Sequence, residues 1–208
     1  TMVEKAALQA FYTATNGDTW TSQTDGNPGN DWDFTGPVTN AWFGLTIAGG
    51  HVVAMDMNPT NRADNNNIQS GYIPDELADL EFLVSLDISA SKLTGPLPVS
   101  LTTLPSLTSL NLWYNDLTGT IPIEVTDMTQ LLVLHLGVNN FPGTIYPEYG
   151  ALVNLQYLNL SNNDLTGTIP TSLGNLVEIR TLIIGEQQLT GNLPVSLRNL
   201  TNLIELSI

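Results

Sequence analysis

Hydrophobic and polar positions follow a pattern that repeats every 24 residues over most of the chain. Each copy opens with apolar residues at its first, fourth and sixth positions, separated by mostly polar ones. Such alternation predicts a short strand with one buried face. Five regular copies begin, in order, at Leu83, Leu107, Leu131, Leu155 and Ile179. A sixth begins at Leu203, and an irregular copy near Val52 precedes the regular ones.

The rest of each copy turns the chain back toward the next strand. Asn115, Asn139 and Asn163 follow three of the strands. Because a buried amide needs partners, we expect these side chains to form a ladder with the main chain of adjacent copies. Ser91 and Gln187 replace Asn in two copies, so these should be tied less tightly. An LTGxIP segment then turns the chain, and a closing x-x-L-x-x-L predicts a helical turn.

A single copy cannot bury its own apolar face, so neighbouring copies must stack into a solenoid. The motif resembles the leucine-rich-repeat family in its plant-type, 24-residue LTGxIP subclass, and the resemblance covers roughly residues 51–208. The family implies an α/β solenoid that coils in a curved, right-handed way. It places a parallel sheet on the concave side and helical turns on the convex side. The LTGxIP segment implies a second short strand in each copy.

Residues 1–50 predict an N-terminal cap, which leaves 51–208 for the repeat array. Residues 3–15 read as a helix whose apolar stripe is Val3, Leu8, Phe11 and Tyr12. A segment rich in Trp follows, and Gly49-Gly50 predicts the turn of a hairpin that leads into the first strand. Trp42, Gly44 and the following residues resemble the caps of plant-type repeats. The absence of Cys makes the cap more similar to those of bacterial and algal surface proteins. The tryptophans should cover the open end of the core.

Composition narrows the range of partners. The chain contains five Lys and Arg residues and 20 Asp and Glu residues, which gives a net charge of −15. Nucleic acid and anionic membrane surfaces should therefore be repelled. With no Cys, disulfides and thiolate metal sites are excluded. No apolar run reaches the roughly 18 residues that a membrane span needs, so membrane insertion is not expected. No motif calls for a cofactor.

Family members usually bind ligands on the concave sheet, so outward-facing strand positions are the candidates for a site. In three neighbouring copies these positions carry aromatic side chains, and polar residues lie beside them. The small residues Gly137 and Ser161 should leave room beside Trp113. Exposed aromatics are favoured at binding hot spots. The competing explanation is that these rings only stack on one another across the strands. The predicted ligand-binding residues are Trp113, Tyr114, His135, Tyr157, Asp87, Asn111 and Asn159.

We therefore predict a non-catalytic recognition module, secreted or at a cell surface, that binds a protein, peptide or glycan. The alternative is a structural or adhesive spacer without a small-ligand site. A more remote alternative is ice binding by the repeated threonines of the LTG segments. Catalysis is not expected, because Asp87 should lie too far from His135 and no Ser stands in a nucleophile context.

Three further features carry expectations. The acidic, Asn-rich loops at residues 25–33 and 61–67 offer oxygen atoms that suit Ca²⁺, but neither has the spacing of a known calcium loop. No metal site is therefore predicted. The last strand, LIELSI, lacks a polar capping unit, which predicts self-association through an open final coil.

Overall fold

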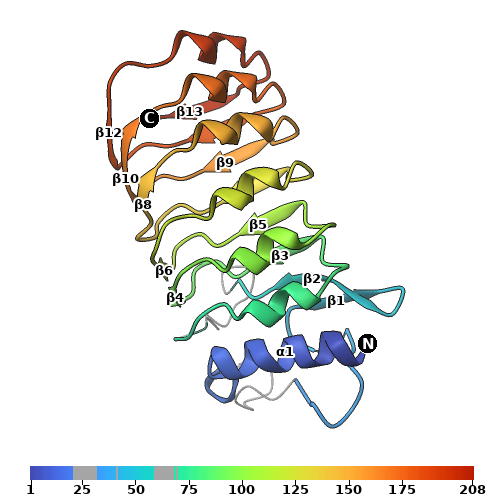
Figure 1. Ribbon diagram of the computed structural model, residues 1–208. Coiled ribbons are helices and arrows are strands. Elements are labelled where there is room, and N and C mark those ends of the chain that lie inside the picture. Colours follow the sequence, from blue (N-terminus) through green and yellow to red (C-terminus); the bar gives the residue numbers. More distant parts are fainter. Residues whose placement is uncertain (21–31, 41, 59–67, 69) are drawn as a thin grey trace.

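The predicted strands form one long sheet. A computed structural model describes residues 1–20, 32–40, 42–58, 68 and 70–208. Within them, eight strands form the main sheet in the order β1-β2-β3-β5-β7-β9-β11-β13, and all neighbours are parallel except the β1–β2 hairpin (Figure 1). The strand bounds are β1 Leu45–Ala48, β2 His51–Asp56, β3 Ser85–Asp87, β5 Ser109–Asn111, β7 Val133–His135, β9 Tyr157–Asn159, β11 Thr181–Ile183 and β13 Glu205–Ser207.

The 24-residue period keeps this sheet in register. Leu86 pairs with Leu110, Leu110 with Leu134, and the same position continues to the last strand. Leu86, Leu110 and Leu134 are fully buried and belong to one hydrophobic cluster that extends from the cap through the repeats, whereas Leu206 in the last strand is 44% exposed. Equivalent residues of successive coils therefore stack directly on each other, as the repeat pattern predicts.

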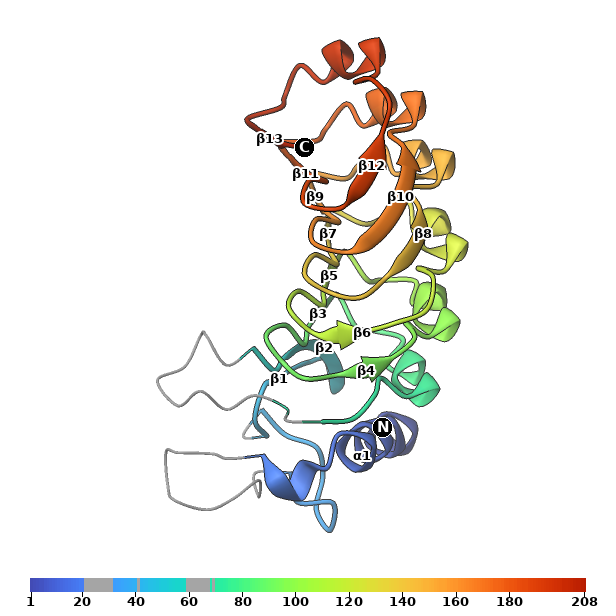
Figure 2. The ribbon, with the colours of Figure 1, turned by 90° about the vertical axis from the view of Figure 1, so that its left-hand side faces the viewer.

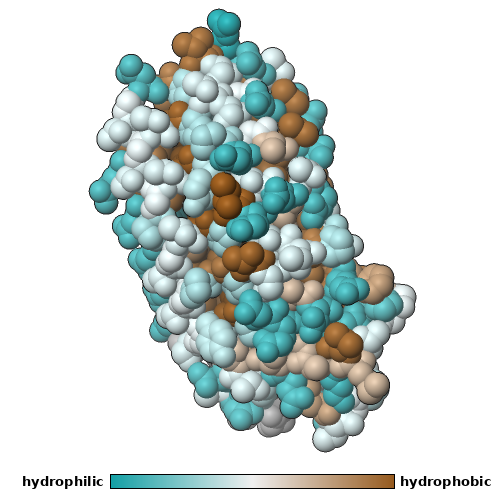
Figure 3. Space-filling view, in the orientation of Figure 1, coloured by the Kyte–Doolittle hydropathy of each residue, from teal (hydrophilic) through white to brown (hydrophobic). Residues whose placement is uncertain are grey.

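Short 3₁₀ turns cover the other side of the core, where the sequence predicts helical turns (Figure 1). Four of the six begin directly after a Pro of the LTGxIP segment, whose fixed backbone suits the start of a turn. From this side, hydrophobic residues form separate spots among polar ones rather than one patch (Figure 3). The turns are η3 Asp75–Asp79, η4 Val99–Thr103, η5 Ile123–Asp127, η6 Pro147–Ala151, η7 Thr171–Asn175 and η8 Val195–Asn199.

The LTGxIP segments add a second set of strands beside the main sheet (Figure 2). In the described part of the chain they form a two-stranded and a three-stranded parallel sheet. The strands are β4 Thr94–Gly95, β6 Asp116–Leu117, β8 Pro142–Thr144, β10 Asp164–Thr168 and β12 Gln188–Thr190. Each of the five regular coils therefore has two strands and one 3₁₀ turn. The prediction of an α/β solenoid is confirmed in its sheet, its turns and its N-terminal helix.

The Asn ladder is present. Asn139 is buried, and its Oδ1 accepts the Leu117 amide at 3.1 Å. Its Nδ2 donates to the carbonyls of Leu112 at 3.0 Å and Leu136 at 3.1 Å. Asn115 and Asn163 make the same set of bonds one coil away on either side. Each amide thus ties three segments of main chain together.

The cap begins with helix α1 (Met2–Ala14), which packs against η3 in line with the 3₁₀ turns (Figure 1). A capping box between Thr1 and Glu4 starts the helix. The predicted apolar stripe is wrong at Val3, which is exposed, whereas the Glu4 side chain is buried. Glu4 can face inward because its carboxylate accepts the Val52 amide at 3.1 Å and lies 3.3 Å from His51 Nδ1.

The cap tryptophans cover the end of the core, as predicted. Trp20, Trp32 and Trp42 are buried, and the ring of Trp32 contacts both others at centroid distances of 5.2 and 5.6 Å. The indole nitrogen of Trp20 donates to the Thr15 carbonyl, and a short 3₁₀ turn, η1 (Gly17–Thr19), precedes Trp20. No helix within the described residues is both long and apolar enough to cross a bilayer.

Candidate functional site

Aromatic side chains from three successive coils lie side by side on the outer face of the main sheet. The Trp113 and His135 rings are stacked with centroids 5.9 Å apart, and the His135 and Tyr157 rings are 5.2 Å apart. Tyr114 extends the series through a 5.3 Å contact with Trp113. We call Trp113, Tyr114, His135 and Tyr157 the aromatic row. The structure therefore brings together all four aromatic residues that the sequence predicts for the site.

The rings also contact one another, as the competing explanation expects, but this does not bury them. Trp113, His135 and Tyr157 keep part of their surface open to solvent. Tyr114 is 56% exposed. The aromatic row is therefore a continuous, accessible surface as well as a set of mutual contacts.

Polar side chains hold one end of the row. Asp87 Oδ1 accepts the backbone amide and the hydroxyl of Ser89, at 2.9 and 2.6 Å. Its Oδ2 accepts Asn111 Nδ2 at 2.9 Å. Asn111 Oδ1 in turn accepts the Trp113 amide at 3.1 Å. These bonds fix the main chain from which the Trp113 ring projects, so Asp87 and Asn111 act as supports beside the row.

His135 is held by its neighbour one coil further on. Ser161 donates its amide and hydroxyl to Asn159 Oδ1, at 2.9 and 2.8 Å. This leaves Asn159 Nδ2 to donate to His135 Nε2 at 3.0 Å. An imidazole nitrogen that accepts a hydrogen bond carries no proton, so neutral His135 has its proton on Nδ1. Asn159 itself is buried, so it supports the site from below instead of presenting its amide to a ligand.

His135 is neutral over the physiological range. Burial lowers its pKa to about 4, although the Asp87 carboxylate opposes the shift. There is no direct hydrogen bond between Asp87 and His135 among the contacts of the described residues, in agreement with the expected distance of two coils. A neutral imidazole that is stacked on Trp113 and contacts Tyr157 at a tilt suits contact with a ligand better than it suits a proton relay.

Gly137 makes this arrangement possible. A Cβ at this position would come within 2.6 Å of Asn159 Oδ1. The sequence suggests that Gly137 and Ser161 leave room for a ligand beside Trp113. The structure instead shows both residues buried, with the Asn159 amide occupying the space over Gly137. The sequence signal for this contact is a Gly that stands beside Trp113 and Ser161 in neighbouring coils.

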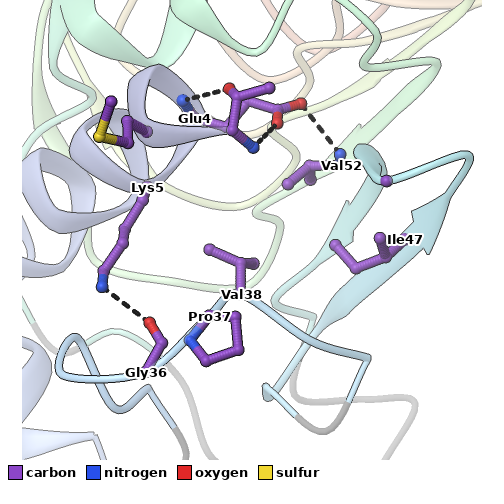
Figure 4. Close-up of a pocket in the computed structure, with 10 residues that line it drawn as sticks. Glu4, Lys5, Gly36, Pro37, Val38, Ile47 and Val52 are labelled. Carbon is purple, nitrogen blue, oxygen red and sulfur yellow. Dashed lines mark hydrogen bonds and ion pairs between the residues drawn. The ribbon is translucent and has the colours of Figure 1, made fainter.

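Away from the aromatic row, the cap contains a hollow with a volume of about 420 Å³. It lies between α1, residues 36–38 and the β1–β2 hairpin (Figure 4). Its polar groups already have partners within the chain. Lys5 Nζ donates to the Gly36 carbonyl at 2.7 Å. Burial raises the pKa of Glu4, but hydrogen bonds from Thr1 and Val52 outweigh it and hold that pKa below its ordinary value. This hollow is therefore part of the packing between the helix and the hairpin.

The part of the chain that the structure describes offers no support for a metal-binding site. No three His, Asp or Glu side chains there are grouped so as to hold a metal ion. Residues 25–31 and 61–67, which carry most of the two acidic loops considered for Ca²⁺, lie outside the described residues.

Comparisons with known proteins agree with this architecture. The family model described as Leucine Rich Repeat matches residues 106–128 and 154–176. The ectodomain of the Arabidopsis thaliana receptor kinase GASSHO1/SCHENGEN3, solved with CASPARIAN STRIP INTEGRITY FACTOR 2, is 30% identical with a TM-score of 0.81. That match covers 97% of this chain and 23% of the receptor chain. No curated protein sequence matches the chain.

Two other solved structures are similar. The Arabidopsis receptor kinase HAESA, in complex with the peptide hormone IDA and the co-receptor SERK1, is 28% identical with a TM-score of 0.81. It matches 99% of this chain and 33% of its own. A plant ice-binding protein is 26% identical with a TM-score of 0.76, over 95% of this chain and 60% of its own. The chain thus spans about a quarter to a third of the two receptor ectodomains.

The repeat motif, the stacked coils and these matches together define the class: this chain is a leucine-rich-repeat protein. More particularly, it resembles the ectodomains of plant leucine-rich-repeat receptors.

Proposed function

We propose that the chain is a non-catalytic recognition module that binds a peptide or protein segment on the aromatic row. The observation that carries the proposal is the placement of four partly exposed aromatic side chains from successive coils in one continuous surface. Aromatic residues dominate binding hot spots because they bury a large area at low entropic cost. Similar ectodomains have been solved with a peptide hormone and with a co-receptor protein.

The proposal extends to where the protein acts and to its subclass. Because the similar receptor domains are ectodomains, we place this chain outside the cell or at its surface. The second strands support assignment to the plant-type LTGxIP subclass. Four points stay predictions: that the cap resembles those of bacterial or algal surface proteins, that the cap ends at residue 50, that the ligand is a glycan, and that the chain self-associates.

A library of displayed linear peptides tests the proposal. The wild type should enrich specific peptides, and a Trp113→Ala, Tyr157→Ala double variant should lose them because both rings that flank His135 are removed. Thr181→Ala is the matched control, because Thr181 occupies the position of Tyr157 one coil further along. Circular dichroism confirms that each variant is folded.

If the double variant still enriches the same peptides, the aromatic row is not the binding site. If no peptide or protein binds the wild type, the chain is better explained as a structural or adhesive spacer.

A second candidate function, ice binding, rests on the match to the plant ice-binding protein and on the threonines of the small sheet. Thr166 pairs with Thr144, and Thr168 pairs with Thr190. The hydroxyls of Thr166 and Thr190 donate to the main chain of the preceding coil, to Gly143 at 3.1 Å and to Gly167 at 3.2 Å, which fixes these two side chains. Pro and Asn interrupt the array at residues 96, 142 and 192.

A thermal-hysteresis assay tests this function directly. Ice binding predicts measurable hysteresis that falls in a Thr168→Lys variant. Absence of hysteresis and of recrystallisation inhibition in the wild type would eliminate ice binding.

A further inference from the structure

A groove lies where the main strands end and the chain turns toward the second strands. Its volume is about 330 Å³, and its lining includes the buried residues Ser91, Asn115 and Asn139. Tyr114 and Val138, which come just before two of these residues in the chain, also line the groove, and we call them the first wall. The other wall is a row in which equivalent positions of three coils differ in chemistry: Lys92, Asp116 and Asn140. We call this feature the edge groove.

The first wall is conformationally costly. Tyr114 and Val138 have positive φ angles of 57° and 56°. Side chains with bulk near the backbone are disfavoured there, by about 1–3 kcal/mol. Ala90 and Asn162 occupy the same position in flanking coils, with φ angles of 51° and 52°. Small residues or Asn therefore satisfy the fold at this position.

Burial does not offset the cost at Tyr114, because its side chain is more than half exposed. Glu186 also belongs to this column, with a φ of 55°, but it lies two coils beyond Val138. Tyr114 and Val138 are adjacent members of the column, and both line the edge groove. A costly residue that adds little to the core is best explained by what it presents at the surface.

Backbone N–H groups that line the groove already donate hydrogen bonds within the chain. The Asn115 amide donates to Val138 at 3.1 Å, and the Asn139 amide donates to Asn162 at 3.1 Å. The amides of Asp116 and Asn140 donate to the preceding coil. A ligand therefore cannot add a strand through main-chain hydrogen bonds here and must use side chains.

The second wall offers such side chains. Among the described residues, the Lys92 ammonium, the Asp116 carboxylate and the side-chain amide of Asn140 make no hydrogen bond or salt bridge. They present a donor, an acceptor and a group that is both. They stand one strand spacing apart, so together they span about 10 Å.

We propose that the edge groove binds a neutral sugar ring, with its C–H face on Tyr114 and Val138 and its hydroxyls on Lys92, Asp116 and Asn140. An apolar wall facing a polar wall matches the two surfaces of a pyranose, one of C–H groups and one of hydroxyls. An anionic ligand is disfavoured, because the one cation adjoins Asp116 and the chain carries −15 overall. Apart from Tyr114, no residue of this groove belongs to the aromatic row, so the proposal does not depend on peptide recognition there.

An array of neutral oligosaccharides that contain glucose, galactose, mannose or xylose tests the proposal, followed by titration of the best-bound oligosaccharide. Tyr114→Asn removes the ring while keeping a residue suited to positive φ, as at Asn162. Asn140→Ala removes one hydrogen-bonding group. We expect either variant to weaken binding by about tenfold or more, since each removes about 1.4 kcal/mol or more of contact.

Two controls separate the edge groove from the aromatic row. Asp164→Ala changes the same row of side chains one coil beyond the groove, and Tyr157→Ala changes the aromatic row alone. Both should leave sugar affinity within about twofold, a change of roughly 0.4 kcal/mol. The proposal is overturned if no neutral oligosaccharide binds. It is also overturned if binding survives Tyr114→Asn and Asn140→Ala, or if Tyr157→Ala abolishes it.

Discussion

Asn139 offers a quantitative test of what holds the coils together. The substitution Asn139→Ala removes the acceptor of the Leu117 amide, and no other acceptor is present for that amide among the described residues. The carbonyls of Leu112 and Leu136 lose one donor each but keep a second, from Asn115 and Asn163. The substitution therefore leaves one buried donor unsatisfied and weakens two acceptors.

The expected cost follows from these contacts. An unsatisfied buried amide costs about 1–3 kcal/mol, and each lost hydrogen bond to a carbonyl that keeps another donor costs about 0.5–1 kcal/mol. We expect Asn139→Ala to lower the free energy of unfolding by about 3 kcal/mol. Urea denaturation followed by circular dichroism measures it, with the m-value showing whether the transition stays cooperative.

Gln187 is the matched comparison one ladder position beyond Asn163. Its Nε2 reaches only the Ile184 carbonyl, and its Oε1 is buried without a partner. Gln187→Asn shortens the side chain to the length that the ladder uses, so it should raise stability by about 1 kcal/mol. A loss below about 1 kcal/mol for Asn139→Ala, with an unchanged m-value, would refute the ladder as a main source of stability.

Three more predictions follow from the site and the cap. His135 should titrate by NMR with a pKa of about 4, and Asp87→Asn should lower that pKa further, because it removes the charge that opposes the shift. The unfolded chain takes up this proton near pH 6.5 and the folded chain only near pH 4, so the free energy of unfolding should fall as the pH drops between these values. A free energy of unfolding that does not change over this pH range, and that has the same pH profile in a His135→Gln variant, would contradict this. Gly137→Ala should cost about 1–3 kcal/mol in urea denaturation because its Cβ displaces the Asn159 amide, and an unchanged midpoint would show that the contact yields freely. Trp20→Ala should cost about 3–5 kcal/mol in the same measurement because the ring is buried, whereas a loss under 1 kcal/mol would mean that the cap folds apart from the repeats.

The fold was predictable because one pattern recurs in register. Leu86, Leu110 and Leu134 alternate with polar residues in the same way, so any single coil predicts its neighbours. The helix of the cap has no second copy, and its apolar stripe was predicted with Val3 in place of Glu4. A buried carboxylate is recognisable only when its partners are known, and here they come from residues 51 and 52.

The proximity of the candidate site residues was predictable, but the hydrogen bonds among them were not. The spacing of the repeats places Trp113, His135 and Tyr157 on adjacent strands, and the structure shows their rings in contact. The spacing of the repeats alone does not show that Asn159 turns beneath the surface. That orientation depends on two hydrogen bonds from Ser161 and on the absence of a side chain at Gly137. Nor does a pattern of apolar and polar residues carry backbone angles, which is why the strained wall of the edge groove was not anticipated.

The rings of the aromatic row come from three different coils, so the row stays continuous only while these three copies remain adjacent. Trp113, His135 and Tyr157 belong to the copies that begin at Leu107, Leu131 and Leu155. Duplication of a whole 24-residue copy elsewhere in the array would lengthen the solenoid and leave the row intact. The same duplication between the first two of these copies would add a coil to an equally regular sheet and separate the rings of Trp113 and His135. Under the proposed function, gain or loss of a repeat between these copies would therefore erase or create the recognition surface in one step, without any point mutation.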